Sequence, residues 1–228
     1  MKNTAIIAAG GKGARFGGDV CKQLLRLKGK TLVAHSLIPF EREPQIAEIV
    51  LVYPRDEPES NYAEVIRAEG FRKVRLVRGG ESRFDSVRHG FLSIDSANVV
   101  LIHDAARPLV SKELVTAVLR AASEKGAAVP LLPVRETVKR LGQDNEVETV
   151  PREALYVAQT PQGFRYDILK AAYDQVAASY AAPSWTDESM LVEVLGVPVT
   201  TVVGERRNIK ITDVEDLRLA EFYYAEPA

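Results

Sequence analysis

The stretch IIAAGGKGARFG, residues 6–17, joins a short apolar run to a glycine-rich loop that contains cations. The run from Thr4 to Ala9 has the length and composition of a buried β-strand. Glycines let backbone N–H groups approach phosphate oxygens closely, because no Cβ intervenes. Arg15 and Lys22 add charge that backbone donors cannot supply. The pattern predicts a strand followed by a loop that binds a polyphosphate.

Two familiar phosphate-binding patterns do not fit this loop. A P-loop needs GxxxxGK followed by Ser or Thr, and the sequence has no such run. The dinucleotide fingerprint GxGxxG could begin at Gly11, but Phe16 occupies its last position, and residues 17–19 are a poor helix start. For the glycine cluster alone, an ordinary flexible loop between a strand and a helix is an open alternative.

Composition limits the class of protein. Of the 228 residues, 46% are hydrophobic and 27% are charged, as in a globular protein with ample core for one large domain. A formal net charge of -1 gives no overall attraction to nucleic acid or to an acidic membrane. The single cysteine, Cys21, excludes an internal disulfide and suits a reducing cytosol. The first apolar run is too short for a signal peptide, and no run reaches membrane-spanning length. We expect a cytoplasmic protein.

Strand-like and helix-like segments alternate along the first 133 residues. Short β-branched runs are typical of parallel strands that are covered on both faces. Between them, apolar residues recur at spacings of three and four, which predicts amphipathic helices. This order implies right-handed crossovers and an α/β fold: a three-layer α/β/α, Rossmann-like domain with a mostly parallel sheet. The predicted strands are 4–9, 48–53, 74–77 and 99–103, and the predicted helices are 31–42, 59–69, 83–93 and 112–125.

The alternation stops at a predicted β-hairpin. Residues 137–141 and 146–150 alternate polar and apolar side chains around the turn sequence GQDN at 142–145. A two-stranded ribbon is marginally stable alone and needs a surface to lie on. The hairpin could fold onto its own domain, or residues 134–160 could form an arm that reaches a partner subunit.

Two loops after predicted strands carry candidate ligand-binding residues. Near residues 78–87, two glycines precede Ser82 and Asp85, either of which could cap the next helix. A glycine turn with a helix cap is the favoured interpretation of that segment alone. In the sequence HDAARP at 103–108, Asp104 could orient a hydroxyl or a metal, and Arg107 could hold a phosphate. A surface Asp–Arg pair is an equally good interpretation.

Two later segments precede predicted helices. Lys210 lies just ahead of the final predicted helix, with Thr212 or Asp213 as its N-cap. The sequence WTDE at 185–188 is interpreted as another N-cap, followed by a helix with an acidic first turn. Taken alone, both segments indicate local structure rather than a ligand site.

Five segments, taken in order, resemble the 2-C-methyl-D-erythritol 4-phosphate cytidylyltransferase family across nearly the whole chain. The family usually has proline before the Lys–Gln pair, where this sequence has Cys21 before Lys22 and Gln23. The lysine charge is kept, so we expect activity to survive. The segments are AAG with Gly13, Arg15, Lys22 and Gln23; GGESRFDSV at 79–87; HDAARP at 103–108; QTPQ at 159–162; and NIKIT at 208–212.

The resemblance implies transfer of CMP from CTP to methylerythritol phosphate, with Mg²⁺ bound to the CTP and with protein metal ligands unknown. It also implies a homodimer in which the arm completes the neighbouring site. The expected catalytic residues are Arg15, Lys22, Arg152 and Lys210. The expected nucleotide-binding residues are Ala8, Ala9, Gly10, Gly11, Gly13, Ala14, Gly80, Glu81, Arg83, Ser86 and Ala105. The expected methylerythritol-phosphate ligands are Asp104, Arg107, Thr137 and Thr160.

Two other functions fit the same sequence features. A sister cytidylyltransferase that acts on ribitol 5-phosphate shares the fold and the nucleotide loop. A catalytically inert nucleotide-binding subunit would also keep the loop, although the presence of Arg15, Lys22 and Lys210 argues against it. We expect the enzyme to have neither nucleic acid nor membrane as a partner.

Overall fold

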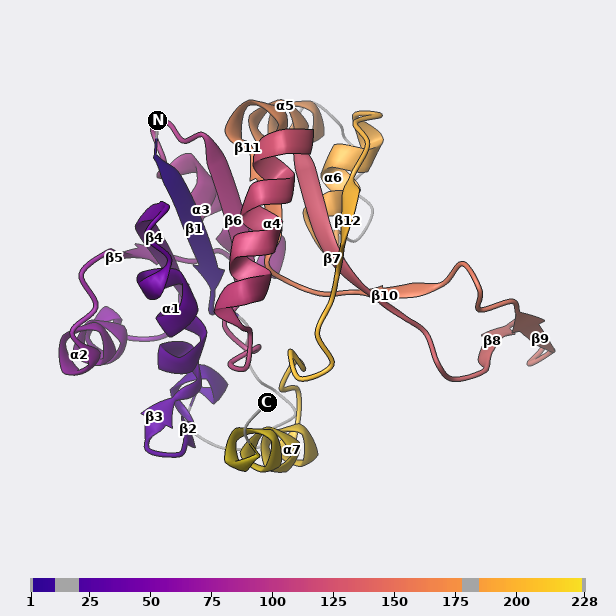
Figure 1. The fold of residues 1–228 in the computed structure, drawn as a ribbon, viewed down its shortest axis with the longest axis horizontal. Coiled ribbons are helices and arrows are strands. Elements are labelled where there is room, and N and C mark those ends of the chain that lie inside the picture. The colour runs from indigo at the N-terminus through magenta and orange to yellow at the C-terminus, as the bar shows by residue number, and fades with distance from the viewer. Residues whose placement is uncertain (1, 11–20, 178–184, 227–228) are drawn as a thin grey trace.

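The computed structural model describes residues 2–10, 21–177 and 185–226. Its body is a sheet with helices on both sides, and one hairpin projects from it (Figure 1). Among the described residues, no helix is long and apolar enough to cross a membrane. The first half of the chain forms β1 (Asn3–Ala8), η1 (Lys22–Leu24), β2 (Arg26–Leu27), β3 (Lys30–Thr31), α1 (Leu32–Arg42), β4 (Ile46–Tyr53), α2 (Glu59–Glu69), β5 (Val74–Arg78), α3 (Arg83–Leu92) and β6 (Val99–Asp104).

The second half begins with α4 and ends with α7, which lies beneath the body in the orientation of Figure 1. Its elements are α4 (Lys112–Lys125), β7 (Ala127–Pro133), β8 (Val138–Leu141), β9 (Val147–Val150), β10 (Tyr156–Ala158), β11 (Gln162–Arg165), α5 (Tyr166–Ala177), α6 (Ser189–Val194), β12 (Thr200–Val203) and α7 (Val214–Ala225).

The central sheet has eight strands in the described part of the chain and is mostly parallel, as predicted. β5, β4, β1 and β6 lie side by side in parallel. β11 pairs antiparallel with both β6 and β7, so β6 and β7 point in the same direction. β10 pairs antiparallel with the far end of β7, and β12 pairs with β7 in parallel. The antiparallel strands therefore lie among parallel ones.

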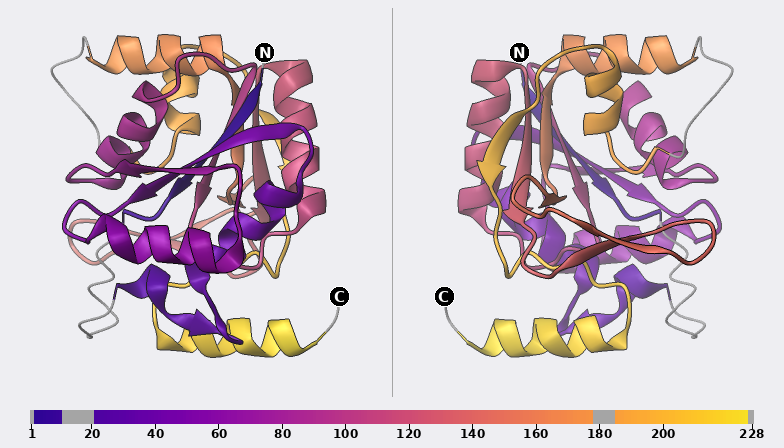
Figure 2. Two further views of the ribbon diagram at one scale, coloured as in Figure 1. Left: turned by 90° about the vertical axis from the view of Figure 1, so that its left-hand side faces the viewer. Right: turned by 90° about the vertical axis from the view of Figure 1, so that its right-hand side faces the viewer.

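Alternate residues of the central strands enter two separate cores. In β1, Ala5 and Ile7 belong to the core beneath α1, α2 and α4. Ile6 and Ala8 belong to the opposite core, beneath α3, α5 and α6. Because successive strand side chains point to opposite faces, a strand covered on both faces must be apolar throughout. Figure 2 shows the body from two further sides, with helices on either side of the strands. The predicted three-layer build is confirmed.

A third, smaller core fixes the last helix. Leu27 of β2 and Leu32 of α1 pack with Ile211 and Ala220, and all four are buried. Asp213 is the N-cap of α7, and its side chain forms a reciprocal capping box with Asp216. This packing holds the segment 208–213 against the end of the sheet.

The predicted hairpin is present as β8 and β9, which project from the body in Figure 1. Its turn closes through Gly142, whose N–H donates to the Glu146 carbonyl over 2.9 Å. Leu141 and Val147 face each other across the strands and are 65% and 62% exposed. The hairpin therefore leaves apolar surface in solvent within one subunit. β10, at the end of the predicted arm, joins the main sheet instead.

Candidate functional site

The glycine loops after β1 and β5 meet at Ser86 of α3. The Ser86 hydroxyl accepts a hydrogen bond from the Gly80 N–H over 3.1 Å. A Cβ at Gly10 would lie 2.6 Å from the Ser86 Oγ, and one at Gly79 would lie 2.8 Å from it. Both loops therefore need glycine for close approach. Ser82, one of the two capping candidates in the sequence, caps α3 through a capping box with Asp85. The expected nucleotide residues Gly10, Gly80 and Ser86 are thus brought together.

The carboxyl ends of β1 and β6 place Asp104 beside the first loop. Ala8 is the register partner of Asp104, and the Ala105 N–H donates to the Ala8 carbonyl over 3.0 Å. The Ala9 N–H donates to the Val52 carbonyl of β4 over 2.9 Å. Ligands in open parallel sheets bind at this end of the strands. Because the side chains of Ala8, Ala9 and Ala105 are small, they leave room for a ligand at this end of the strands.

Asp104 is a buried carboxylate between two cations. Its Oδ1 accepts from Arg83 Nε at 3.0 Å, and its Oδ2 lies 2.8 Å from the Lys210 ammonium. Burial by itself would raise the pKa of Asp104, but the charges of Arg83 and Lys210 overcome it and hold the pKa well below the usual range. Asp104 is therefore an anion that fixes the position of Lys210.

Glu188 is a member of this cluster that the sequence did not reveal. Its two carboxylate oxygens accept from the two terminal nitrogens of Arg83 over 3.0 and 3.1 Å. The predicted acidic first turn of the following helix is wrong: α6 begins at Ser189, and Glu188 occupies the N-cap position without a side-chain capping hydrogen bond. The neighbouring Asp187 accepts from the Met190 N–H instead. The bidentate Arg83 geometry could be recognised only in three dimensions, because its partners lie 105 residues apart.

A buried chain of hydrogen bonds through His103 and Thr160 ends at the backbone N–H of Asp104. His103 Nε2 lies 3.1 Å from the Arg107 carbonyl, which can only accept, so Nε2 carries the proton. His103 Nδ1 then accepts from the Thr160 hydroxyl over 2.9 Å. The Thr160 Oγ1 in turn accepts from the Asp104 N–H over 3.1 Å. Burial lowers the pKa of His103 to about 4, which keeps the imidazole neutral and this direction of donation intact.

The segment 208–211 links the remaining expected residues. Lys22 is buried, and its ammonium donates to the Ile211 carbonyl over 2.8 Å. Arg107 donates to the Asn208 carbonyl over 2.8 Å, and the Asn208 side chain donates to the Thr160 carbonyl over the same distance. Lys22, Arg107, Thr160 and Lys210, expected from separate parts of the sequence, are therefore brought to one place.

The structure does not bring Thr137, Arg152 or Glu81 into this cluster. Thr137 and Arg152 are exposed and flank β8 and β9, which project from the body in Figure 1. Glu81 is 82% exposed and forms an ion pair with Arg55 at 2.6 Å. The expectations for Gly11, Gly13, Ala14 and Arg15 lie outside the described residues.

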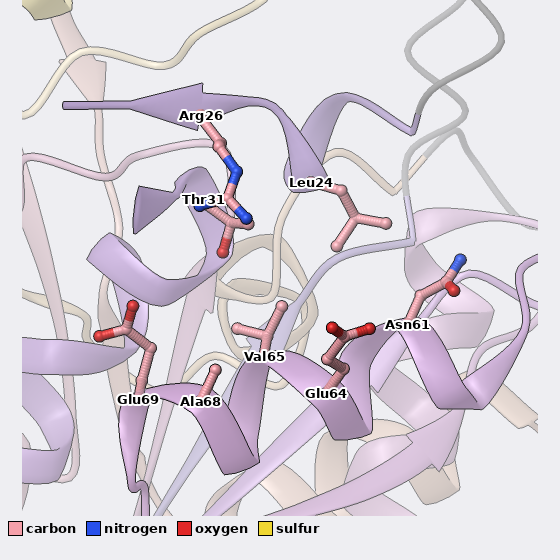
Figure 3. Close-up of a pocket in the computed structure, with 8 residues that line it drawn as sticks. All are labelled: Leu24, Arg26, Thr31, Asn61, Glu64, Val65, Ala68 and Glu69. Carbon is pink, nitrogen blue, oxygen red and sulfur yellow. The ribbon is translucent and has the colours of Figure 1, made fainter. Parts of the chain in front are cut away.

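Of two surface cavities, one includes expected nucleotide-binding residues and the other does not. One of about 610 Å³ is lined by Gly79, Gly80 and Glu81, together with Arg55, Arg78 and His89, and so includes expected nucleotide residues. Another of about 360 Å³ lies between α2 and the β2–β3 hairpin, where Leu24 faces Val65 (Figure 3). That second pocket contains none of the expected site residues. We therefore assign it no part in the site.

The described residues include no group of three or more His, Cys, Asp or Glu side chains that could hold a metal. Asp104, the register partner of Ala8, has both of its carboxylate oxygens engaged by Arg83 and Lys210. Mg²⁺ commonly binds proteins through few carboxylates, keeping several waters and taking substrate phosphates as ligands. This donor set fits a Mg²⁺ ion held mainly by a triphosphate.

Comparison with known proteins gives one consistent result. Residues 3–226 match the family model described as 2-C-methyl-D-erythritol 4-phosphate cytidylyltransferase, IspD. The protein of that name from Pelotomaculum thermopropionicum is 43% identical over 224 residues, covering 96% of this chain and 93% of that one.

Solved structures agree. The crystal structure of 2-C-methyl-D-erythritol 4-phosphate cytidylyltransferase from Thermus thermophilus is 34% identical, with a TM-score of 0.81 and coverage of 99% of this chain and 100% of that one. The structure of 4-diphosphocytidyl-2C-methyl-D-erythritol synthase from Anaerococcus prevotii is 31% identical, with a TM-score of 0.86 and coverage of 99% and 96%. The chain therefore belongs to the 2-C-methyl-D-erythritol 4-phosphate cytidylyltransferase family, enzymes that make 4-diphosphocytidyl-2-C-methyl-D-erythritol in isoprenoid biosynthesis.

Proposed function

We propose that this enzyme performs cytidylyl transfer with Arg15 and Lys22 at the reacting phosphate and with Lys210 and Arg152 on the attacking one. A phosphate oxygen of methylerythritol phosphate attacks the α-phosphorus of CTP in line, and pyrophosphate leaves. No side-chain nucleophile is required. The protein contributes positioning and neutralises the charge that develops in the transition state.

The observation that carries the proposal is that Lys22 and Lys210 are both held at the segment 210–211. The Lys22 ammonium is held by the carbonyl of Ile211, the residue after Lys210. The Lys210 ammonium is held by Asp104 at the end of β6. Two cations from opposite ends of the chain are thereby fixed at the edge of the sheet where the glycine loops also meet. Paired cations at fixed positions suit a reaction between two phosphates.

We assign the nucleotide to the first and second glycine loops. Ala8, Ala9 and Ala105 leave space beside Gly10, while Gly80, Glu81 and Ser86 supply polar groups for the cytidine. Gly11, Gly13 and Ala14, with Arg15, complete the triphosphate site in this proposal. The contact of Arg83 with CTP stays a prediction, because in the structure three of its donors serve Asp104 and Glu188.

We assign Mg²⁺ to the triphosphate, with waters and phosphate oxygens as its main ligands. The bound ion would neutralise charge on the phosphates and orient them. The protein's part is to hold the triphosphate through the first loop and Lys22. Asp104, Arg107 and Thr160 would hold the methylerythritol phosphate at the sheet edge. Asp104 is suited to accept from a hydroxyl because it is ionised and fixed.

We also propose a homodimer. Leu141 and Val147 of the arm are exposed, and burial of such surface normally drives association. A two-fold pair would let each arm deliver Thr137 and Arg152 to the cluster of its neighbour. This would supply the two expected substrate contacts that lie away from the cluster in one subunit.

We further propose that the dimer works in the cytoplasm, with CTP and methylerythritol phosphate as its partners and with no nucleic acid or membrane. The near-zero net charge gives no general affinity for either polyanion. The single cysteine suits a reducing compartment.

The test of the site is Lys210→Ala, assayed by pyrophosphate release. We expect a higher KM for methylerythritol phosphate and a lower kcat, with the KM for CTP near the wild-type value. Lys112→Ala, at the start of α4, is the matched control and should leave all constants unchanged. Substituting ribitol 5-phosphate for methylerythritol phosphate separates the two sister activities. Unchanged kinetics in a folded Lys210→Ala protein would refute the assignment.

A further inference from the structure

Glu188 is buried beside the site at the N-cap position of α6. Its side chain is 1% exposed and holds both terminal nitrogens of Arg83. The capping of α6 is performed by Asp187, which accepts from the Met190 N–H and the Ser189 hydroxyl. The Glu188 side chain therefore takes no part in capping the helix that it precedes. Both oxygens of its carboxylate accept hydrogen bonds from Arg83.

Four charges alternate from the interior to the surface. Glu188 holds Arg83, Arg83 holds Asp104, and Asp104 holds Lys210. The exposed fractions of the two carboxylate side chains are 1% and 9%, whereas that of Lys210 is 42%. Arg83 is 25% exposed, so Lys210, at the end of the series, is its most exposed member.

The geometry explains why the inner carboxylate affects the outer lysine. A bidentate arginine pair fixes the plane of the guanidinium as well as its position. With that plane fixed, Arg83 Nε faces Asp104 Oδ1 and leaves Oδ2 to Lys210. A guanidinium freed from Glu188 could rotate, and Asp104 would lose the contact that orients its two oxygens.

A buried ion pair is a poor device for stability alone. Desolvation of the two charges offsets their attraction, and apolar residues of similar size often stabilise a fold as well or better. The Arg83–Glu188 ion pair is better explained by the group whose position it fixes. Through Asp104, that group is the Lys210 ammonium.

We propose that Glu188 is a positioning residue for the polyol-phosphate site, acting through Arg83 and Asp104 to set the place of the Lys210 ammonium. The inference rests on the proposed role of Lys210 in holding methylerythritol phosphate. It adds a residue of the 185–188 segment, more than a hundred residues from Arg83 in sequence, to the determinants of that site.

The experiment uses Glu188→Gln, which keeps the volume but removes the charge. We expect kcat/KM for methylerythritol phosphate to fall by about 10- to 100-fold, because small displacements of a substrate-holding group are costly. The KM for CTP should change less than that for methylerythritol phosphate, although Arg83 is itself a predicted CTP contact. Asp187→Asn is the matched control: it alters the same helix start without touching Arg83, and its kinetics should be normal.

A double mutant distinguishes positioning from a structural role. If Glu188 acts through Lys210, then Glu188→Gln combined with Lys210→Ala should be no slower than Lys210→Ala alone. Additive losses, or equal effects of Glu188→Gln on both substrates, would overturn the inference. A Lys210→Ala protein with normal kinetics would instead refute the proposed site itself.

Protein folding is monitored by circular dichroism and thermal unfolding. If Glu188→Gln does not fold, Glu188→Asp replaces it, because it keeps the charge while being too short to hold both nitrogens in the same geometry. It should show the same selective loss with methylerythritol phosphate. Normal kinetics in a folded Glu188→Asp protein, with Arg83 no longer held at both nitrogens, would also overturn the inference.

Discussion

Charged side chains are buried in the cluster around Asp104 and exposed on the β8–β9 arm. In the cluster, Asp104 and Glu188 are buried and every carboxylate oxygen has a cationic partner. On the arm, Arg140 and Glu148 form an ion pair that is about two-thirds exposed at each end. Exposed pairs contribute little to stability, so the arm has little of its own to hold it rigid.

Under the proposed homodimer, this difference would divide the site between two subunits. One subunit would prepare the part of the site that needs fixed charge, because burial makes each cation and anion hold the other. The arm carries Thr137 and Arg152 in solvent, where their final positions depend on what the arm packs against. The cluster should therefore respond to mutation within its own subunit, and the arm should respond through the neighbour.

The largest expected effect is that of Lys22→Ala. The loss of one transition-state donor typically lowers kcat by about 10²- to 10³-fold. The KM for CTP should change much less, since the triphosphate keeps its backbone contacts. Steady-state kinetics with pyrophosphate detection measure both constants. Lys170→Ala, an exposed lysine paired with Asp174 on α5, is the control. A Lys22→Ala enzyme with near-normal kcat would contradict the assignment.

Mixing two inactive mutants tests the division between cluster and arm directly. A Lys22→Ala subunit is defective in its own loop, and an Arg152→Ala subunit is defective in the site that its arm serves. A heterodimer of the two should contain one intact site, so activity should return to roughly half the wild-type value per heterodimer. If subunit exchange is demonstrated and activity stays absent, Arg152 serves its own subunit.

The interior of the cluster should make the fold sensitive to acid. Burial lowers the pKa of His103 to about 4 from 6.5, so the unfolded chain binds more protons between these values. The contribution of His103 to the free energy of unfolding should therefore fall as pH is lowered through this window and level off below it. The contribution of His103 amounts to at most about 3 kcal/mol.

Urea denaturation at about pH 7 and about pH 4.5 measures this dependence. His103→Gln should weaken it, while the exposed control His89→Gln should keep it. His35, whose pKa is also lowered by burial, would account for part of the remaining slope. Equal pH dependence in wild type and His103→Gln would show that another group carries the effect.

The smallest expected effect is that of Cys21→Pro. The Cys21 φ of -56° already lies within the range that proline adopts. A compatible proline typically raises the free energy of unfolding by about 0.4–1 kcal/mol. Turnover should stay near the wild-type value, and thermal unfolding should shift slightly upward. Loss of activity in a folded variant would show that this loop follows a different path from that of proteins with proline here.

Much of the fold was predictable because its periodicity is local. The predicted helices 59–69 and 112–125 coincide with α2 and α4, and the predicted strand 4–9 overlaps β1. The hairpin was predicted from alternation and its turn. α5 was not predicted, although Leu169, Ala172 and Tyr173 provided the helical spacing. The short strands β2, β3 and β12 were missed because two to four residues carry little periodic signal.

The site was predictable only in part, because its motifs identify residues but not their partners. The segments with Asp104, Arg107, Thr160 and Lys210 were found in the sequence, and the structure brings these four residues together. The role of Glu188 was not found. Its position before a helix favours a local capping interpretation, and only the approach of α6 to α3 reveals Arg83 as its partner. The roles of Thr137 and Arg152 stay predictions.

The amino-acid sequence by itself determined the class of fold, the alternation of strands and helices through its first half, and the family, since these follow from local patterns and from motifs in a fixed order. Tertiary structure decided which charges meet. The bond from Lys22 to Ile211 and the series from Glu188 to Lys210 join segments that are far apart in the chain. Charges interact through space and are stabilised or desolvated by burial, and neither distance nor burial is encoded in sequence spacing.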